Sequence, residues 1–202
     1  MSLSLTLILL LITAAMTIYA WQNPTVLSRW MFNAYQIARR NEYWRFLTSG
    51  FVHADWGHLI FNMISLYFFG QILEQVVGRE YYLALYLAGI IISEIPSYLK
   101  HRNNPNYNSL GASGGVAAVV FAGIVFFPLN PIYIFFIPIG IPGFLFGILY
   151  MLYSYYEANR GGSYVNHSAH LWGALFGVAF VVVLFPGAVP RFFEQVLSYR
   201  PF

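Results

Sequence analysis

The amino-acid sequence predicts an all-α membrane protein, a single bundle of six transmembrane helices. Hydrophobic residues make up 59% of the 202 residues and charged residues only 8%, against about 45–50% and about 25% in an ordinary soluble domain. A soluble fold could not cover its surface with so few charges. The apolar blocks follow one another without a polar linker, so we expect one domain over residues 1–202.

Six apolar blocks account for the predicted helices, since about 30 Å of hydrocarbon requires roughly 20 apolar residues in helical form. They are residues 3–21, 56–73, 81–99, 112–128, 141–156 and 168–185. The first block has no basic segment before it, which favours a retained helix over a cleaved signal peptide. The fifth should begin irregularly, because residues 137–143 are rich in proline and glycine.

The loop between the first two blocks, residues 22–55, should lie on the membrane surface. It contains aromatic and basic residues, which are typical of the headgroup level: Trp30, Trp44, Arg39, Arg40 and Arg45. The net charge of +3 comes from ten scattered Lys and Arg, without a basic run that would bind nucleic acid. The absence of cysteine excludes disulfides, thiolate nucleophiles and cysteine-ligated metals.

Polar residues converge at one depth of the predicted bundle. Helices two, four and six must enter the membrane from the same side, so their first turns share a leaflet. Those turns contain His58 and Asn62, then Ser113, then His167 and His170. Polar side chains within membrane spans usually face the bundle interior or a watery cavity, which makes them candidates for function.

Ser113 is the candidate nucleophile. It lies between Gly111 and Gly114, and these glycines allow a close backbone approach and leave amides open near a helix N-terminus. The match to G-x-S-x-G is weak by itself, because the soluble hydrolase motif needs a preceding strand and none is predicted. The alternative is a small-residue site for helix packing, from Gly111 to Gly115.

A serine hydroxyl needs a base, and we favour His170. Gly173 and Gly177 share its helical face and permit a tight contact with a neighbouring helix. If that neighbour is helix four, the imidazole comes within reach of Ser113. His167 is the alternative base, and a structural hydrogen bond is the alternative role for either histidine.

His58 and Asn62 project from one helical face and can donate hydrogen bonds. With the Ser113 amide they would form a donor cluster for a tetrahedral oxyanion; a polar clamp between helices is the alternative. His53 is expected at the interface, and the sequence offers no metal-ligand pattern around it. Asp55 is the single aspartate, so we expect a Ser-His dyad.

Glu94 is the one carboxylate within an apolar block. Such a residue is a candidate for function. It also lies near the end of its helix, shortly before Lys100. We therefore favour a carboxylate that reaches the interface over a role at the site.

Four segments in order resemble the rhomboid family of intramembrane serine proteases, in its basic six-helix bacterial form. The first loop has Trp44-Arg45, and helix two has the H-x-x-x-N pattern of His58 and Asn62. The G-x-S-G pattern of helix four spans residues 111–114, and the A-H-x-x-G-x-x-x-G pattern of helix six spans residues 169–177.

The resemblance implies that Ser113 is the nucleophile, that His170 is the general base, and that His58 and Asn62 supply the side chains of the oxyanion hole. It further implies hydrolysis of transmembrane protein substrates without a cofactor, in contact with membrane lipids. The sequence departs from the family at Ala117, where many relatives have a tyrosine whose ring packs on the catalytic histidine. Whether another ring compensates is left open by the sequence.

The resemblance also implies a multi-pass protein of a bacterial inner membrane with an extracytoplasmic active site. The loop charges oppose this orientation, because seven of the basic residues lie on the proposed catalytic side: Arg29, Arg39, Arg40, Arg45, Lys100, Arg102 and Arg160. We follow the family, since arginines in a surface loop can bind lipid headgroups.

Two other functions compete with proteolysis. One is a catalytically silent rhomboid-like scaffold that binds transmembrane helices, although such relatives usually lack the serine or the histidine. The other is a small-solute transporter, for which an inverted repeat would be expected and is not evident. The sequence predicts neither the oligomeric state nor the natural substrate.

Overall fold

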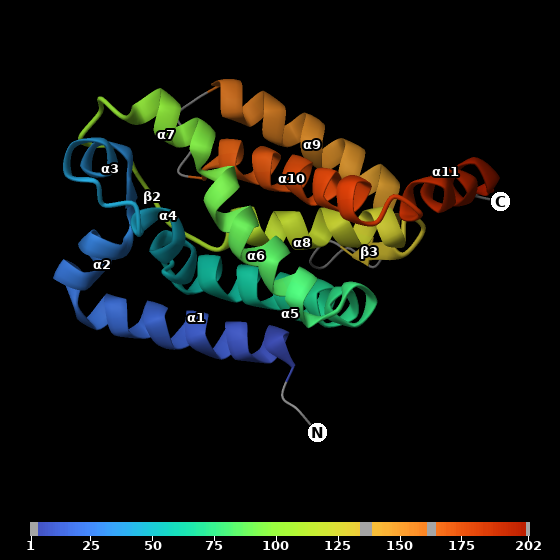
Figure 1. Ribbon diagram of the computed structural model, residues 1–202, viewed down its shortest axis with the longest axis horizontal. Helices are drawn as coiled ribbons and strands as arrows, with labels where there is room; N and C mark the ends of the chain where they lie inside the picture. Colours follow the sequence, from blue (N-terminus) through green and yellow to red (C-terminus); the bar gives the residue numbers. More distant parts are fainter. Residues whose placement is uncertain (1–3, 134–138, 161–164, 201–202) are drawn as a thin grey trace.

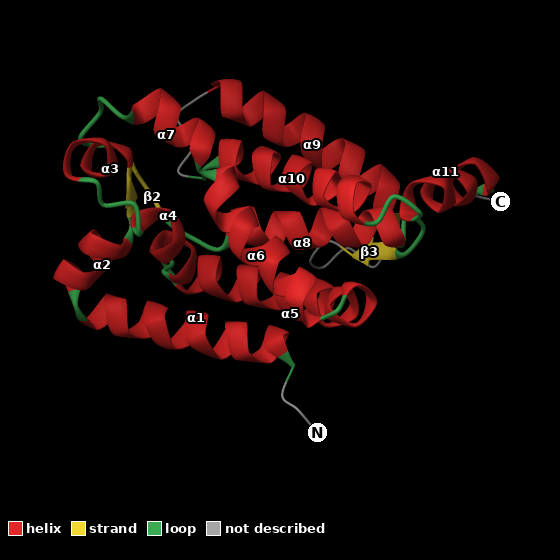
Figure 2. Cartoon of the chain, in the orientation of Figure 1, coloured by secondary structure: helices red, strands yellow, loops and turns green. Residues whose placement is uncertain are grey.

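The computed structural model describes residues 4–133, 139–160 and 165–200. Helices dominate this part of the chain, and the long ones run roughly parallel in one bundle (Figure 1): α1 (Leu5–Gln22), α5 (Trp56–Val77), α8 (Ser113–Phe126), α9 (Gly143–Arg160) and α10 (His167–Leu184). The described strands form two short antiparallel ribbons (Figure 2). The prediction of a mainly helical membrane protein is confirmed.

Each predicted apolar block contains a helix. Among the described residues, four spans are long and apolar enough to cross a bilayer: α1 (Leu5–Gln22), α5 (Trp56–Val77), the joined helices α6 and α7 (Arg79–His101) and α10 (His167–Leu184). The remaining two are α8 (Ser113–Phe126), which is apolar but shorter, and α9 (Gly143–Arg160). Most side chains of α8 are buried, because α5, α6, α9 and α10 pack around it.

The third block is not one continuous helix. It divides into α6 (Arg79–Ser93) and α7 (Ile95–His101), with Glu94 between them. Pro96 lies in the first turn of α7, where its missing N–H costs little. The Tyr98 amide then donates to the Glu94 carbonyl at 2.9 Å and continues the helical path.

The first loop is largely helical and is fastened from within. It contains α2 (Pro24–Trp30), β1 (Phe32–Asn33), α3 (Ala34–Arg40), α4 (Arg45–Thr48) and the 3-10 turn η1 (Ser49–Phe51). The Arg45 guanidinium donates to the carbonyls of Ser28 (2.9 Å) and Met31 (2.8 Å) and pairs with Glu42 (2.6 Å). Arg45 is buried, so it holds the loop together instead of facing headgroups.

Two short ribbons join distant segments. Strand β1 pairs with β2 (Asn108–Ser109), which attaches the first loop to the segment that leads into α8. Strand β3 (Pro131–Tyr133) pairs with β4 (Gly140–Pro142) just before α9. The described approach to α9 is therefore non-helical, as its proline and glycine predict, but it is a paired strand and not the irregular segment expected; Ile137 and Pro138 lie outside the described residues. The sequence did not predict α11 (Ala188–Ser198), which follows α10.

Glycines set the distance between α8 and α10. A Cβ atom on Gly173 would collide with the backbone of Gly114, and one on Gly177 would lie 2.8 Å from the Ala118 Cα. Real Cβ atoms essentially never come that close, so the two backbones are in direct contact. The tight contact that the sequence predicted for Gly173 and Gly177 is therefore made with helix α8.

Candidate active site

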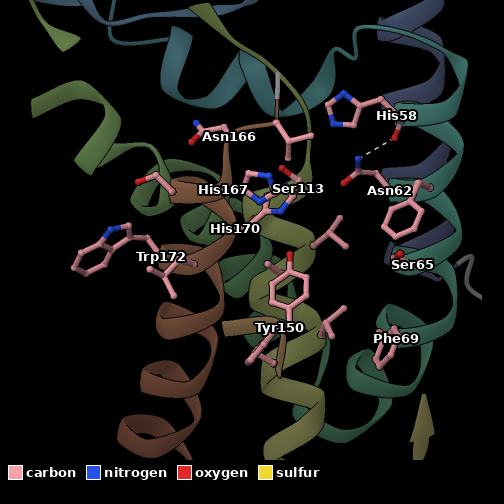
Figure 3. A pocket seen from close by; sticks show the side chains of 18 of the residues that line it. His58, Asn62, Ser65, Phe69, Ser113, Tyr150, Asn166, His167, His170 and Trp172 are labelled. Carbon is pink, nitrogen blue, oxygen red and sulfur yellow. Dashed lines mark hydrogen bonds between the residues drawn. The ribbon is translucent and has the colours of Figure 1, made fainter. Parts of the chain in front are cut away.

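A cavity of about 1790 Å³ opens between α5, α8, α9 and α10. Ser113, His170, His58 and Asn62 all line it, and Figure 3 shows their side chains around the same space. Aromatic and aliphatic side chains form much of the remaining wall, among them Phe61, Phe68, Phe69, Ile72 and Ile124. The fold thus gathers the four predicted polar residues, which come from three helices, around one largely apolar cavity.

Ser113 is the first residue of α8. The chain reaches it through Gly111, whose φ of 120° is readily adopted only by glycine. The Gly111 amide donates to the Ser49 carbonyl at 2.9 Å, which attaches this turn to η1. The first amides of a helix have no partner within the helix, so the start of α8 offers donors beside the Ser113 hydroxyl.

His53 supports this turn from behind. Its side chain is wholly buried within the protein. Its Nε2 accepts the Ala112 amide at 3.2 Å, and its Nδ1 lies 3.1 Å from Thr17 Oγ1. Burial and, to a lesser extent, the neighbouring His58 lower the pKa of His53 to about 3. His53 is therefore neutral, as an acceptor at Nε2 requires.

His58 and Asn62 lie on the opposite wall of the cavity from His170 (Figure 3). Asp55 caps α5 by accepting the His58 amide at 2.8 Å. The His58 imidazole packs directly on Gly111, where a Cβ atom would collide with its Cε1 and Nε2. The Asn62 Nδ2 donates one of its two N–H groups to the His58 carbonyl at 2.9 Å, which leaves the second N–H for a ligand.

An aromatic ring stacks on His170, and it comes from a different helix from the one expected. Ala117 is buried in α8, and its methyl side chain cannot supply an aromatic ring to His170. Tyr150 of α9 supplies a ring to His170, with the two ring centroids 6.2 Å apart and an angle of 16° between the planes. The departure at Ala117 is thus accompanied by a ring supplied by α9.

His167 lies one turn before His170 and also lines the cavity. Its ring meets Tyr153 edge-on at 5.4 Å and lies 5.7 Å from His170. The buried Nδ1 atom of His167 has no hydrogen-bond partner among the described residues. Both histidines thus line the cavity, and among the described residues a parallel ring lies against His170 but not against His167.

Ser113 and the two histidines of α10 line the same cavity, and Figure 3 draws them in the same region of it. Among the residues drawn there, the one hydrogen bond joins Asn62 to His58, and none joins Ser113 to His170. Catalytic hydrogen bonds are often long in a free enzyme and shorten when substrate binds. The two residues therefore share one cavity, and no hydrogen bond between them is seen among the described residues.

The other residues that the sequence predicted to support the site do not line the cavity. Gly114 packs on Ser93 of α6, where a Cβ atom would collide with the serine side chain. Trp44 is 44% exposed, and neither it nor Arg45 lines the cavity. Within the described residues, no cluster of three or more His, Cys, Asp or Glu could hold a metal ion.

Glu94 does not reach the interface as predicted, since only 6% of it is exposed. Its carboxylate is bound by Ser109 and Asn166. The sequence analysis gave no role to Tyr150 or Asn166. Tyr150 lies on α9, where the sequence predicted no site residue. Asn166 was missed although it caps α10 four positions before His170, a helical spacing that could have found it.

Comparison with known proteins places these residues in a family. The Rhomboid domain family matches residues 40–187. The chain is 35% identical over 144 residues to RHOMBOID-like protein 12, mitochondrial, of Arabidopsis thaliana, covering 63% of this chain and 42% of the relative.

Two further relatives are similar to parts of the chain. Human presenilin-associated rhomboid-like protein, mitochondrial, is 32% identical over 141 residues, covering 67% of this chain and 36% of the relative. The Bacillus subtilis protein YdcA is 33% identical over 95 residues, covering 46% and 47%. This chain spans less than half the length of each of these three relatives.

Proposed function

Because this chain belongs to the rhomboid family, we propose that it is an intramembrane serine protease that hydrolyses peptide bonds in or near transmembrane segments of other membrane proteins. One observation carries the proposal. Ser113, at the open N-terminus of α8, and His170, on α10, line the same cavity, and their helices are in backbone contact through Gly114 and Gly173.

In the proposed reaction, His170 takes the proton of the Ser113 hydroxyl as the oxygen attacks the scissile carbonyl. The resulting oxyanion accepts hydrogen bonds from the Ser113 amide and from the second N–H of the Asn62 side chain, with His58 beside them. The protonated His170 then gives its proton to the leaving amine, and water hydrolyses the acyl-enzyme with His170 again as base. Residues of this chain supply every proton transfer in this scheme, and no cofactor takes part.

The composition of the cavity wall favours a substrate that lies within the membrane. Its apolar side chains suit a transmembrane segment, whereas the polar groups gather at the α8 and α10 N-termini. We infer that α8 and α9 cross the membrane with the four longer spans, which gives six crossings in a single domain over residues 1–202. We further infer a bacterial cell membrane with the active site on the extracytoplasmic side.

The test is cleavage in proteoliposomes. A single-span substrate with helix-destabilising residues near one membrane face should be cut by the wild-type protein and left intact by Ser113→Ala and by His170→Ala. A folded wild-type protein that binds such substrates without cutting them would instead support the silent scaffold.

A further inference from the structure

Glu94 is a buried carboxylate outside the proposed reaction. It stands at the break between α6 and α7 with only 6% of its surface exposed. Within the described residues, no Lys, Arg or His lies within ion-pair distance of it; the ion pairs there are Arg45–Glu42, Arg79–Glu74 and Arg160–Glu157. Burying a carboxylate without a cation is costly unless hydrogen bonds replace its hydration. The hydrogen-bond partners of Glu94 therefore identify the segments that it connects.

The partners of Glu94 come from two distant segments. Ser109 Oγ donates to Oε1 at 2.8 Å, and the Asn166 side-chain amide lies 3.2 Å from both Oε1 and Oε2. The same amide lies 3.1 Å from Ser109 Oγ and 3.2 Å from Ser97 Oγ. One carboxylate thus joins the α6–α7 junction, strand β2 and the segment before α10.

Each partner leads directly to a residue of the proposed dyad. Ser109 lies in β2, four residues before Ser113. Asn166 caps α10, because its Oδ1 accepts the Ala169 amide at 3.0 Å, and its carbonyl accepts the His170 amide at 3.2 Å. The network therefore connects the segment before the nucleophile to the cap of the helix that carries the base.

The glycine contacts between α8 and α10 do not by themselves fix the position of the first turn of α10. Gly173 and Gly177 set how closely the two helices approach, at and below the level of His170. They provide no hydrogen bond that would fix how far the first turn of α10 lies along α8. A carboxylate suits the upper connection, since its two oxygens accept from both segments and carry no N–H that would oppose the Asn166 amide.

On the basis of the proposed function, we propose that Glu94 is a positioning residue: with Asn166 and Ser109 it sets the placement of His170 relative to Ser113. It contacts no substrate. Its removal should lower the maximal rate of the serine without weakening reagent binding, because a misplacement on the order of 1 Å costs about 10²-fold in rate.

The experiment measures labelling of Ser113 by a fluorophosphonate over a range of probe concentrations, which separates the maximal rate from the half-saturating concentration. The variants are Glu94→Gln, Asn166→Asp and the exchanged pair Glu94→Gln/Asn166→Asp. The exchanged pair restores one carboxylate facing one amide, and aspartate remains a good helix cap. Glu80→Gln is the matched control, because Glu80 is an exposed carboxylate of α6. Unfolding temperatures are measured for all of them.

We expect each single variant to lose about tenfold or more of the maximal rate at an unchanged half-saturating concentration, with the exchanged pair recovering most of it. A purely structural role would lower the unfolding temperature without this rate pattern. Wild-type rates in a folded Glu94→Gln variant, or no recovery in the exchanged pair, would overturn the inference about Glu94 and leave the proposed function standing. No labelling of folded wild-type protein would overturn the proposed function, and the inference with it.

Discussion

Gly173→Ala should disable the site while leaving the fold in place. The added Cβ atom would lie 3.0 Å from both the Cα and the carbonyl carbon of Gly114, and closer still to its carbonyl oxygen. Ordinary contacts of a Cβ atom are 3.4–4 Å, and all three obstructing atoms belong to the backbone. No side-chain rotation can relieve this clash, so α10 must move away from α8.

The size of the effect follows from this displacement. A retreat on the order of 1 Å restores normal contact and should cost about 1–3 kcal/mol of stability, as overpacking typically does. His170 lies one turn before Gly173, and Ser113 immediately precedes Gly114, so the same movement separates base and nucleophile. A misplacement of about 1 Å can lower a rate by about 10²-fold.

The assay is the rate of fluorophosphonate labelling at Ser113, measured with the unfolding temperature of the same sample. Gly147→Ala is the matched control, because the nearest atom to its new Cβ would be Phe121 Cε1 at 3.4 Å, and Gly147 does not line the cavity. We expect the control to label at the wild-type rate. A folded Gly173→Ala protein that also labels at the wild-type rate would refute the argument that this contact sets the dyad distance.

Three further predictions test separate parts of the structure. Tyr150→Phe should keep most of the labelling rate and Tyr150→Ala should lose about tenfold, since the ring and not the hydroxyl stacks on His170; equal rates in the two would exclude a role for the ring. Arg45→Ala should lower the free energy of unfolding by about 3 kcal/mol, because it leaves buried partners unpaired; a loss below about 1 kcal/mol, measured by denaturant titration, would contradict this. The pKa of His53 is lowered to about 3 from 6.5, so the unfolded chain binds a proton between these values that the folded chain does not. The contribution of His53 to the free energy of unfolding should therefore be fully present above pH 6.5 and should fall by at most about 1.4 kcal/mol per pH unit below it. His53→Gln should remove this part of the pH dependence of stability; an unchanged pH dependence in His53→Gln would refute it.

The helices and the convergence of the site were predictable from the sequence. Long apolar blocks predict membrane helices, and the alternation of crossings brings Ser113, His58 and His170 to one face. The break at Glu94 was not predicted, because the block remains apolar on both sides of it, although Pro96 is a signal that could have shown it. Helix α11 was missed for another reason: its 11 residues are too few and too polar for a search directed at membrane spans.

The connections between helices could not be predicted from the sequence. Spacing rules relate residues on one helix, whereas Tyr150 meets His170 across two helices and Glu94 meets Asn166 across 72 positions. The burial of His53 likewise depends on how η1 and the turn before α8 fold over it. Ala117 signalled that a ring was missing from α8, and only the packing of α9 shows where a ring is supplied.

The most direct test of the central claim is covalent labelling of the detergent-solubilised protein by a fluorophosphonate, with the modified residue located by mass spectrometry. An activated dyad predicts labelling at Ser113 that is abolished by Ser113→Ala and by His170→Ala. Absence of labelling in a folded, lipid-reconstituted sample, or labelling that survives Ser113→Ala, would contradict the assignment of this chain as a serine protease.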